Sequence, residues 1–170
     1  VNDTNSSTKF NKLNIIDTID NVDSKIEGIN RYIKEIEKSK LYAKQFNIDT
    51  TLATSIYFIA KSKKLNPTLV FSIISVESSF DANAVSNKDA RGLMQVKPST
   101  AILYGIKSHR LLERKENLKA GIDHLGWCLK VENNDLVRAL ERYNKGNKFN
   151  TTNYADKILR RASFSYLKEF

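Results

Sequence analysis

Glu77 is the residue whose type and position point most directly to chemistry. It ends an apolar run that begins near Thr68, and it follows Ile73 by four residues and Ile74 by three. Residues at these spacings share one face of a helix, and an apolar face packs into the core. The sequence therefore predicts a carboxyl group that points inward from the last turn of a helix.

Two physical effects would act on such a carboxyl group in the same direction. Burial disfavours the ionised form, and so does the negative end of the helix dipole. Both raise the pKa, and a carboxyl group that stays protonated near neutral pH can act as a general acid, as a glutamate of lysozyme does in cleaving a glycosidic bond. Periodicity alone leaves a plainer interpretation open, in which Glu77 pairs with a buried arginine or accepts backbone hydrogen bonds.

Four short motifs follow one another along the chain: Val76-Glu-Ser-Ser-Phe80, Ala90-Arg-Gly-Leu-Met-Gln-Val96, Arg142-Tyr-Asn-Lys-Gly146 and Tyr154-Ala-Asp-Lys-Ile158. In this order and spacing they resemble the motifs of the soluble-type lytic transglycosylases, which are relatives of goose-type lysozyme. The resemblance covers residues 50–168 and leaves the N-terminal region outside. One such motif would be weak evidence, whereas four in order make a specific match.

The resemblance implies a lysozyme-like fold, a peptidoglycan substrate and no cofactor. Glu77 would be the sole catalytic acid and base, first protonating the oxygen between N-acetylmuramic acid and N-acetylglucosamine. It would then take the proton of the 6-hydroxyl that attacks the anomeric carbon, leaving a 1,6-anhydromuramyl end. The matching motif positions would bind the substrate: Ser78, Gly92, Met94, Gln95, Tyr143, Asn144 and Tyr154.

The chemistry of these residue types allows such roles without requiring them. Gly92 can adopt backbone angles that bring a loop close to a sugar, and the Gln95 amide can both donate and accept hydrogen bonds. The Tyr154 phenol could bond to Glu77 and fix its rotamer. Plainer interpretations remain: a solvated loop amide for Gln95, and core packing for Met94 and for the ring of Tyr143.

Two positions depart from the family pattern, and two other functions stay open. Arg142 replaces a common Ala before Tyr-Asn, and Asp89 stands where Gly is common. A lysozyme-like hydrolase would need a positioned water and a second carboxylate, for which Asp81 is the nearest candidate. Asp often begins turns, so we expect Asp81 to cap a loop instead. The other alternative is a non-catalytic wall-binding scaffold subunit.

The elements that must position these residues are helices. Capping residues and Pro positions predict helices over residues 49–64, 66–77, 98–105, 111–131, 134–144 and 153–168. Strand signals are nearly absent. The chain should therefore be all-α, with at most a small β element in residues 81–92. We expect residues 48–170 to form the catalytic domain and residues 1–47 to form a polar tail and a separate helix.

That separate helix carries a regular apolar seam. The spacing alternates between four and three along Ile15, Ile19, Val22, Ile26, Ile29, Ile33 and Ile36. This is about three heptad repeats. One interpretation is a coiled coil through which residues 15–36 self-associate, and Ile at nearly every seam position would then favour more than two strands. The other is a single amphipathic helix that lies on the following domain.

Composition narrows the partners. The 170 residues carry a net charge of +9, which favours an anionic partner. Basic runs with interleaved aromatic residues are absent, so we expect anionic wall polymers and not nucleic acid. No apolar run reaches the length of a membrane span. A peptidoglycan substrate implies a cell-envelope or extracellular location, reached through an upstream signal or anchor outside this sequence.

Cysteine and histidine offer no second chemistry. Cys128 is the single cysteine, and its apolar neighbours predict a buried structural thiol. His109 and His124 lie far from the motifs and far from other ligand residues in the sequence. We therefore expect no metal site.

Overall fold

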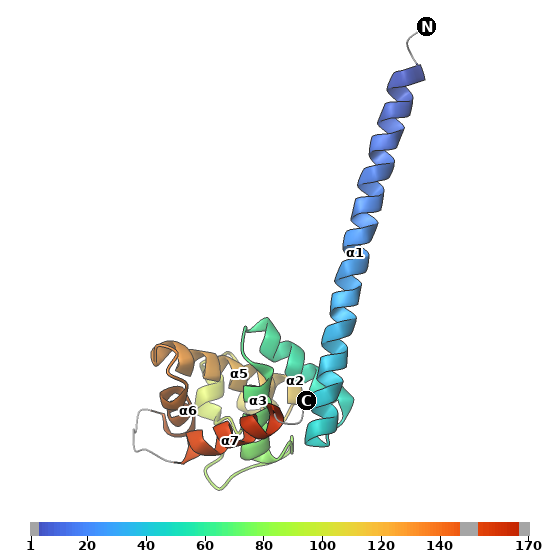
Figure 1. The fold of residues 1–170 in the computed structure, drawn as a ribbon. Coiled ribbons are helices and arrows are strands. Elements are labelled where there is room, and N and C mark those ends of the chain that lie inside the picture. Colours follow the sequence, from blue (N-terminus) through green and yellow to red (C-terminus); the bar gives the residue numbers. More distant parts are fainter. Residues whose placement is uncertain (1–3, 147–152, 167–170) are drawn as a thin grey trace. The chain divides into compact units, whose positions relative to one another are not determined.

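The computed structural model describes the backbone of residues 4–146 and 153–166, and the side chains of residues 16–146 and 153–163 (Figure 1). Helices are the only regular secondary structure among these residues. The helices are α1 (Thr4–Phe46), α2 (Thr50–Ser62), α3 (Pro67–Ser78), α4 (Pro98–Ile102), α5 (Arg114–Val131), α6 (Leu136–Lys145) and α7 (Tyr154–Tyr166), with a 3-10 turn at Ser108–Arg110. The prediction of an all-α chain is confirmed.

The chain divides into two compact units between Ser39 and Lys40. Helix α1 runs through this division. The boundary predicted at residue 47, between a tail with a helix and the expected catalytic domain, follows the end of α1 at Phe46 and stays a prediction. The two units are described separately below.

In the first unit the predicted apolar seam lies on a continuous helix. The side chains of Ile19, Val22, Ile26, Ile29 and Ile33 are each about half exposed, between 48% and 59%. The Ile15 side chain lies outside the described residues. A row of exposed aliphatic side chains at heptad spacing therefore runs along this part of α1.

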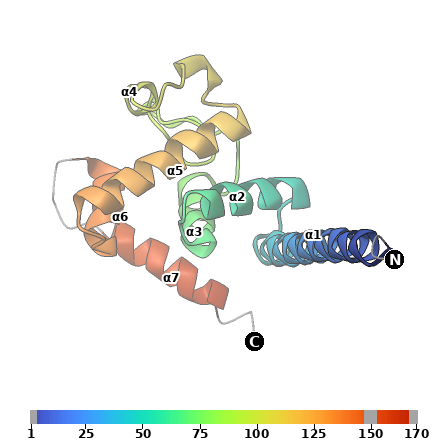
Figure 2. The same cartoon turned by 90° about the horizontal axis from the view of Figure 1, so that it is seen from above.

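In the second unit α3 is the central helix. Val70, Phe71, Ile73 and Ile74 are completely buried. Figure 2 shows α3 nearly end-on, with α2, α5 and α7 around it. Burial of this length of α3 on nearly all sides follows from its apolar composition, since an apolar helix is stable only inside a core.

Aromatic rings connect the last turns of α1 to this core. Tyr42 stacks on Phe71 with ring centroids 4.4 Å apart, and Phe46 stacks on the same ring at 5.4 Å. The Tyr42 hydroxyl shares a hydrogen bond with Thr68 Oγ1 at 2.7 Å. The end of α1 thus belongs to the core of the second unit.

The helix starts follow the capping residues in the sequence. Asn66 Oδ1 accepts from the Thr68 amide at 2.9 Å, and Pro67 occupies the first turn of α3. Asp49 and Asp135 cap α2 and α6 in the same way. These caps satisfy amides that have no partner within their own helix.

Two predicted boundaries are wrong. The helix predicted over residues 98–105 ends at Ile102. The sequence predicted a helix from Leu111, but α5 begins at Arg114. The preceding residues instead form the 3-10 turn, and Arg110 makes a two-bond ion pair with Glu113, at 2.9 and 2.8 Å, just before the helix. The possible β element is reduced to isolated bridges that pair Arg91 with Val85 and with Val96, without a strand in the described residues.

Candidate active site

Glu77 lies in the last turn of α3, where the sequence predicted it. The Tyr154 hydroxyl, from the first residue of α7, donates a hydrogen bond of 2.6 Å to Glu77 Oε1. Burial raises the pKa of the Glu77 carboxyl above its ordinary value, and the hydrogen bond from Tyr154 opposes part of that rise. Among the described residues no Lys or Arg forms an ion pair with Glu77, so the structure does not provide the arginine partner of the plainer interpretation.

Tyr143 supplies a second phenol beside Glu77. Its hydroxyl donates a hydrogen bond of 2.8 Å to the Met94 carbonyl oxygen. Burial and the nearby charge of Glu77 together raise the pKa of Tyr143 well above its ordinary value, and the same two causes act on Tyr154. Both phenols therefore stay protonated and can act only as neutral hydrogen-bonding groups in the physiological range.

Ser78 connects the end of α3 to the neighbouring loop. Its hydroxyl lies 2.8 Å from the Leu93 carbonyl oxygen and 3.3 Å from that of Ile74. The next residue, Ser79, ends the helix with a φ of 51°. Ser78 thereby holds the loop of residues 81–96 against the helix that carries Glu77.

Asn117 closes that loop from the other side, although the sequence analysis did not identify it. The side chain is buried, its Nδ2 donates to the carbonyl oxygens of Arg91 and Leu111 at 2.7 Å each, and its Oδ1 accepts from the Met94 amide at 2.8 Å. A signal existed in the sequence: Asn117 precedes Gly121 by four residues and Leu125 by eight, on the buried face of α5.

The hydrogen bonds of the Asn117 side chain are called the Asn117 clasp below. Gly92 has a φ of +71°, and its α-carbon lies against this clasp. A side chain there would come within 2.6 Å of the Leu111 carbonyl oxygen and closer still to the Asn117 amide nitrogen. Glycine at position 92 is therefore required by the packing of the loop as well as by its backbone angle.

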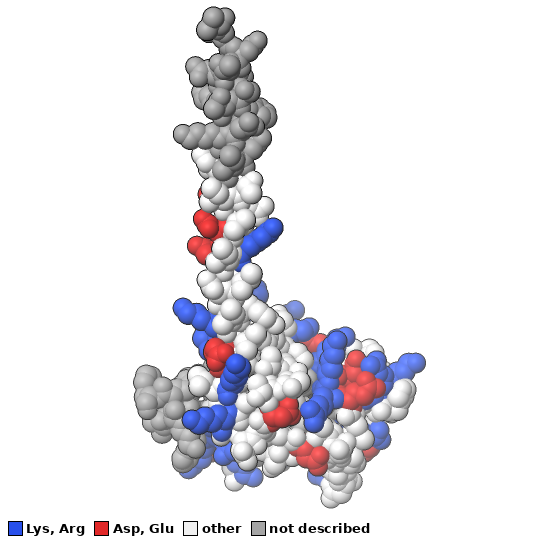
Figure 3. Space-filling model, turned by 90° about the vertical axis from the view of Figure 1, so that its right-hand side faces the viewer, with Lys and Arg blue, Asp and Glu red and all other residues white. Residues whose placement is uncertain are grey.

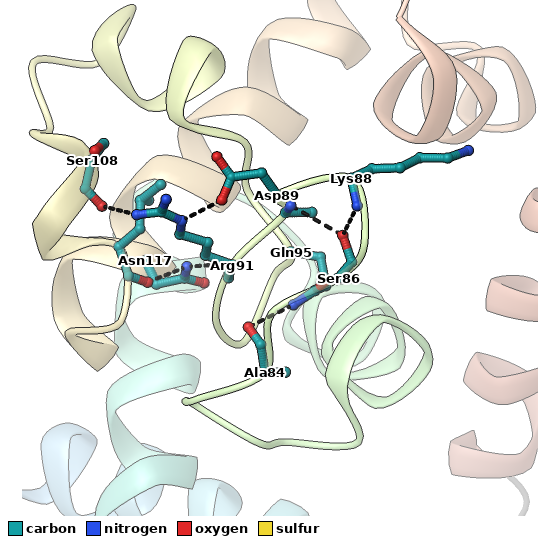
Figure 4. Close-up of polar contacts among 10 residues, drawn as sticks. Ala84, Ser86, Lys88, Asp89, Arg91, Gln95, Ser108 and Asn117 are labelled. Atoms are coloured by element: carbon teal, nitrogen blue, oxygen red, sulfur yellow. Dashed lines mark hydrogen bonds and ion pairs between the residues drawn. The ribbon is translucent and has the colours of Figure 1, made fainter.

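Gln95 bonds to its own loop (Figure 4). Its Nε2 donates to the carbonyl oxygen of Ala84 at 3.2 Å, as Figure 4 shows, and to that of Gly92 at 3.0 Å. In the same view Arg91 bonds through Nε to Asp89 and through Nη1 to the Ser108 carbonyl oxygen. The amide nitrogen of Gln95 is therefore engaged within the protein, and its oxygen is the atom left to meet a ligand.

The other two candidate residues, Met94 and Asn144, differ from Glu77 in their exposure to solvent. Met94 is completely buried and fits against Gly121, where any added β-carbon would collide with it. Asn144 is exposed near the end of α6. The structure thus brings together Glu77, Tyr143 and Tyr154, uses Ser78, Gly92 and Gln95 to shape the adjoining loop, and leaves Asn144 on the surface.

Both departures from the family pattern have a structural explanation. Asp89 has a φ of 59°, a left-handed conformation that Gly adopts freely and Asp tolerates better than most residues. Arg142 donates to Glu132 Oε1 at 2.5 Å and lies over the Trp127 ring, while Arg138 pairs with the other oxygen at 2.7 Å. These two arginines lower the pKa of Glu132.

Among the described residues, Cys128 and His124 do not take part in a cluster that could hold a metal. Cys128 is buried, and burial raises the pKa of its thiol to about 12. The His124 Nδ1 atom and the Tyr104 hydroxyl share a hydrogen bond of 3.1 Å, and the His124 ring stacks on the Trp127 ring. In the part of the chain that the structure describes, no cluster of three or more His, Cys, Asp or Glu could hold a metal, and no helix is long and apolar enough to cross a membrane.

Comparison with known proteins places these features in a family. A family model described as "Transglycosylase SLT domain" matches residues 54–160. The membrane-bound lytic murein transglycosylase D of Escherichia coli strain K12 is 30% identical over 125 residues, which are 69% of this chain and 28% of that protein. The membrane-bound lytic murein transglycosylase E of Buchnera aphidicola subsp. Acyrthosiphon pisum is 30% identical over 131 residues, 66% of this chain and 59% of that protein.

A solved structure shares the fold. The X-ray structure of an inactive mutant of the lytic transglycosylase Slt from Pseudomonas aeruginosa matches with a TM-score of 0.59 and 23% identity. The match covers 68% of this chain and 24% of that one. It shows the lysozyme-like helical fold that the sequence predicted. The chain spans less than two thirds of the length of each of these proteins.

Proposed function

This chain belongs to the transglycosylase SLT domain family, and on that premise we propose that it cleaves peptidoglycan glycan strands as a lytic transglycosylase. Residues 48–170 carry the activity. The reaction breaks the β-1,4 bond between N-acetylmuramic acid and N-acetylglucosamine and leaves a 1,6-anhydromuramyl end.

One observation carries the proposal: a half-buried glutamate with a raised pKa, held by a phenol from another helix. The Tyr154 hydroxyl occupies Glu77 Oε1 as a donor at 2.6 Å. The acidic proton of Glu77 then lies on Oε2, which has no partner among the described residues. A carboxylic acid that is fixed by one oxygen and presents its proton on the other is arranged as a general acid.

The proposed reaction has two proton transfers and uses no water. Glu77 gives its proton to the bridging oxygen as the bond from the muramic-acid anomeric carbon to that oxygen breaks. The 6-hydroxyl oxygen of the same sugar then bonds to the anomeric carbon and its proton returns to Glu77. The substrate's own N-acetyl group assists the departure, and the carboxyl group ends as it began.

The hydrolytic alternative is less well supported, because its second carboxylate has another use. Asp81 is exposed, and its Oδ1 accepts from the amide of Asn83 at 2.8 Å within its own turn. This is the loop-capping contact expected from the sequence. The non-catalytic scaffold remains the outcome if the protein binds glycan strands without cutting them.

Product analysis tests the function. Purified peptidoglycan is digested with the wild-type chain and with Glu77→Gln, and the released fragments are weighed by mass spectrometry. We expect muramic-acid ends lighter by one water than hydrolysed ends, and none with Glu77→Gln. Ends of the hydrolysed mass would instead indicate a muramidase. Turnover by folded Glu77→Gln would exclude Glu77 as the acid.

We propose that anionic wall polymers also attract the protein. On the face in Figure 3, Lys and Arg side chains are spread over the second unit with acidic residues among them. With a net charge of +9, binding to isolated wall polymers should weaken as salt is raised. A cell-envelope location fits this substrate, and the relatives from Escherichia coli and Buchnera aphidicola are named as membrane-bound.

We further propose that residues 15–36 associate with further copies of this chain. The exposed aliphatic row repeats at heptad spacing, the pattern that lets helices wind around one another and bury the row. Ile at most seam positions favours assemblies of more than two strands.

A further inference from the structure

Glu141 is a buried carboxylate for which the proposed reaction has no direct use. It lies in α6 and is only 8% exposed. Its Oε1 accepts a hydrogen bond of 3.1 Å from the amide of Ala155, the second residue of α7. A carboxylate from one helix thus binds the first turn of another helix.

The first turn of a helix has backbone amides without partners inside the helix, and here the first two residues of that turn are buried. Tyr154 and Ala155 are 8% and 2% exposed, so water cannot readily satisfy those amides. A negative charge at the positive end of a helix dipole is also favourable. Glu141 therefore fixes the start of α7 by both a hydrogen bond and its charge.

The residue beside this contact is the one that bonds to Glu77. Tyr154 immediately precedes Ala155, and its hydroxyl reaches across to Oε1 of Glu77 in α3. We propose that Glu141 is a positioning residue that anchors the first turn of α7 and thereby holds the Tyr154 hydroxyl on Glu77. The proposal deepens the proposed function and rests on it, because that function makes the orientation of Glu77 matter.

Such an anchor matters because the Tyr154 hydroxyl lies at the far end of a long side chain. A phenol hydroxyl is far from its own backbone, so a small rotation of the first turn displaces it enough to break a short hydrogen bond. Misplacement of a catalytic group by about 1 Å can lower a rate by about 100-fold. An anchor on the neighbouring amide limits that rotation.

The test compares four variants of the full chain with the wild type. Glu141→Met keeps a similar volume but cannot accept a hydrogen bond. Glu141→Gln keeps the acceptor and removes the charge. Asp135→Ala removes the carboxylate cap of α6, where Asp135 Oδ1 accepts from the Arg138 amide at 3.0 Å, and serves as the matched control. Tyr154→Phe removes the hydroxyl itself.

The readout is the pKa of Glu77, which is measured by carbon NMR of its side-chain carboxyl group in the protein without substrate. We expect Glu141→Met to raise this pKa, as Tyr154→Phe does, because both variants take the Tyr154 hydroxyl off Glu77, and that hydrogen bond favours the ionised form. Glu141→Gln keeps the hydrogen-bond acceptor and loses only the charge, so it should raise the Glu77 pKa less than Glu141→Met does, and Asp135→Ala should leave that pKa at the wild-type value. In turnover assays kcat should fall about tenfold for Glu141→Met, with KM nearly unchanged.

The proposal is overturned if Glu141→Met leaves the Glu77 pKa unchanged, or if Glu141→Gln shifts it as far as Glu141→Met does. It is also overturned if Tyr154→Phe has no effect on that pKa. Should Glu141→Met fail to fold, Glu141→Asp replaces it, and its shorter side chain should raise the pKa by a smaller amount. The NMR readout requires no substrate, so failure of the wild type to release anhydro ends counts against the proposed function alone.

Discussion

The Tyr154 hydroxyl lies 2.6 Å from Glu77 Oε1, although 77 residues separate the two in the chain. The contact joins the last turn of α3 to the first turn of α7. It decides which oxygen of the carboxyl group carries the acidic proton. Desolvation and this hydrogen bond oppose each other, and the pKa of Glu77 stays raised because desolvation is the larger effect.

Tyr154→Phe should move the pH dependence of the reaction as well as slow it. Loss of the hydrogen bond leaves desolvation unopposed, so the pKa of Glu77 rises and the acid stays protonated to higher pH. The alkaline limb of kcat/KM against pH should therefore shift upward. The rate itself should fall roughly 10- to 100-fold, the equivalent of one hydrogen bond to a charged group.

Tyr42→Phe is the matched control for that measurement. It removes a buried phenol hydroxyl that bonds to Thr68 at 2.7 Å in the core. The alkaline limb should stay where it is in wild type. An equal shift in both variants would mean that Tyr154 does not act on Glu77 directly.

Glu77→Gln should change stability in a pH-dependent way. The folded-state pKa of Glu77 is raised above 4.5, so the folded protein holds this proton more tightly than the unfolded chain does. That stabilisation is complete at pH values below the pKa of Glu77 in the unfolded chain. It is lost as the pH rises through the pKa of Glu77 in the folded protein. As pH rises over this window, the free energy of unfolding of Glu77→Gln should therefore increase relative to that of wild type. Urea denaturation at several pH values measures this difference.

Glu113→Gln should show the opposite sign. The hydrogen bond from Arg110 lowers the pKa of Glu113, so its stabilisation is present above the unfolded value and is lost as pH falls through the folded value. Wild type should therefore gain on Glu113→Gln as pH rises. Parallel curves for wild type and Glu77→Gln would contradict a raised pKa at Glu77.

Gly92→Ala and Gly105→Ala should separate backbone strain from collision. Both glycines have a φ of +71°, but a β-carbon at Gly105 meets open space, whereas one at Gly92 meets Asn117 and Leu111. We expect the free energy of unfolding to fall by about 1–2 kcal/mol in Gly105→Ala. In Gly92→Ala it should fall by about 2–5 kcal/mol, because overpacking adds to the backbone strain. Chemical denaturation measures both, and equal losses would show that the Asn117 clasp yields.

Cys128 should be inert in the folded protein. The thiol is buried, and its pKa is raised to about 12, so very little thiolate exists at pH 8. We expect no reaction with a disulfide reagent such as DTNB over the time in which the unfolded chain reacts completely. Rapid reaction of the folded protein would mean that α5 opens at this position.

The sequence predicted well the features that depend on local spacing. The inward position of Glu77 follows from its distance of three and four residues from Ile74 and Ile73, and the start of α3 follows from Asn66 and Pro67. Such features are local, because residues one helical turn apart share a face in any helix. The pairing of Glu77 with Tyr154 was expected as well, but mainly from the order of the four motifs.

Contacts between distant elements were mostly beyond reach. The Asn117 clasp joins three backbone segments, and nothing in the spacing of the chain says which carbonyl groups will meet it. The same holds for the Glu141 anchor on Ala155. The start of α5 was misplaced because the ion pair between Arg110 and Glu113, not the apolar periodicity, marks the turn before it.

The exposed seam of α1 should drive self-association, and one substitution should weaken that association strongly. Ile26 is at a seam position and is 49% exposed, while Asn21 lies off the seam. Burial of an isoleucine stabilises by about 1.5–3 kcal/mol, so Ile26→Asp, repeated on every copy, should weaken association about 100-fold or more. Asn21→Asp adds the same charge and should associate like wild type. Sedimentation equilibrium over a range of concentrations measures all three, and a wild-type chain that stays monomeric throughout would exclude the seam as a self-association surface.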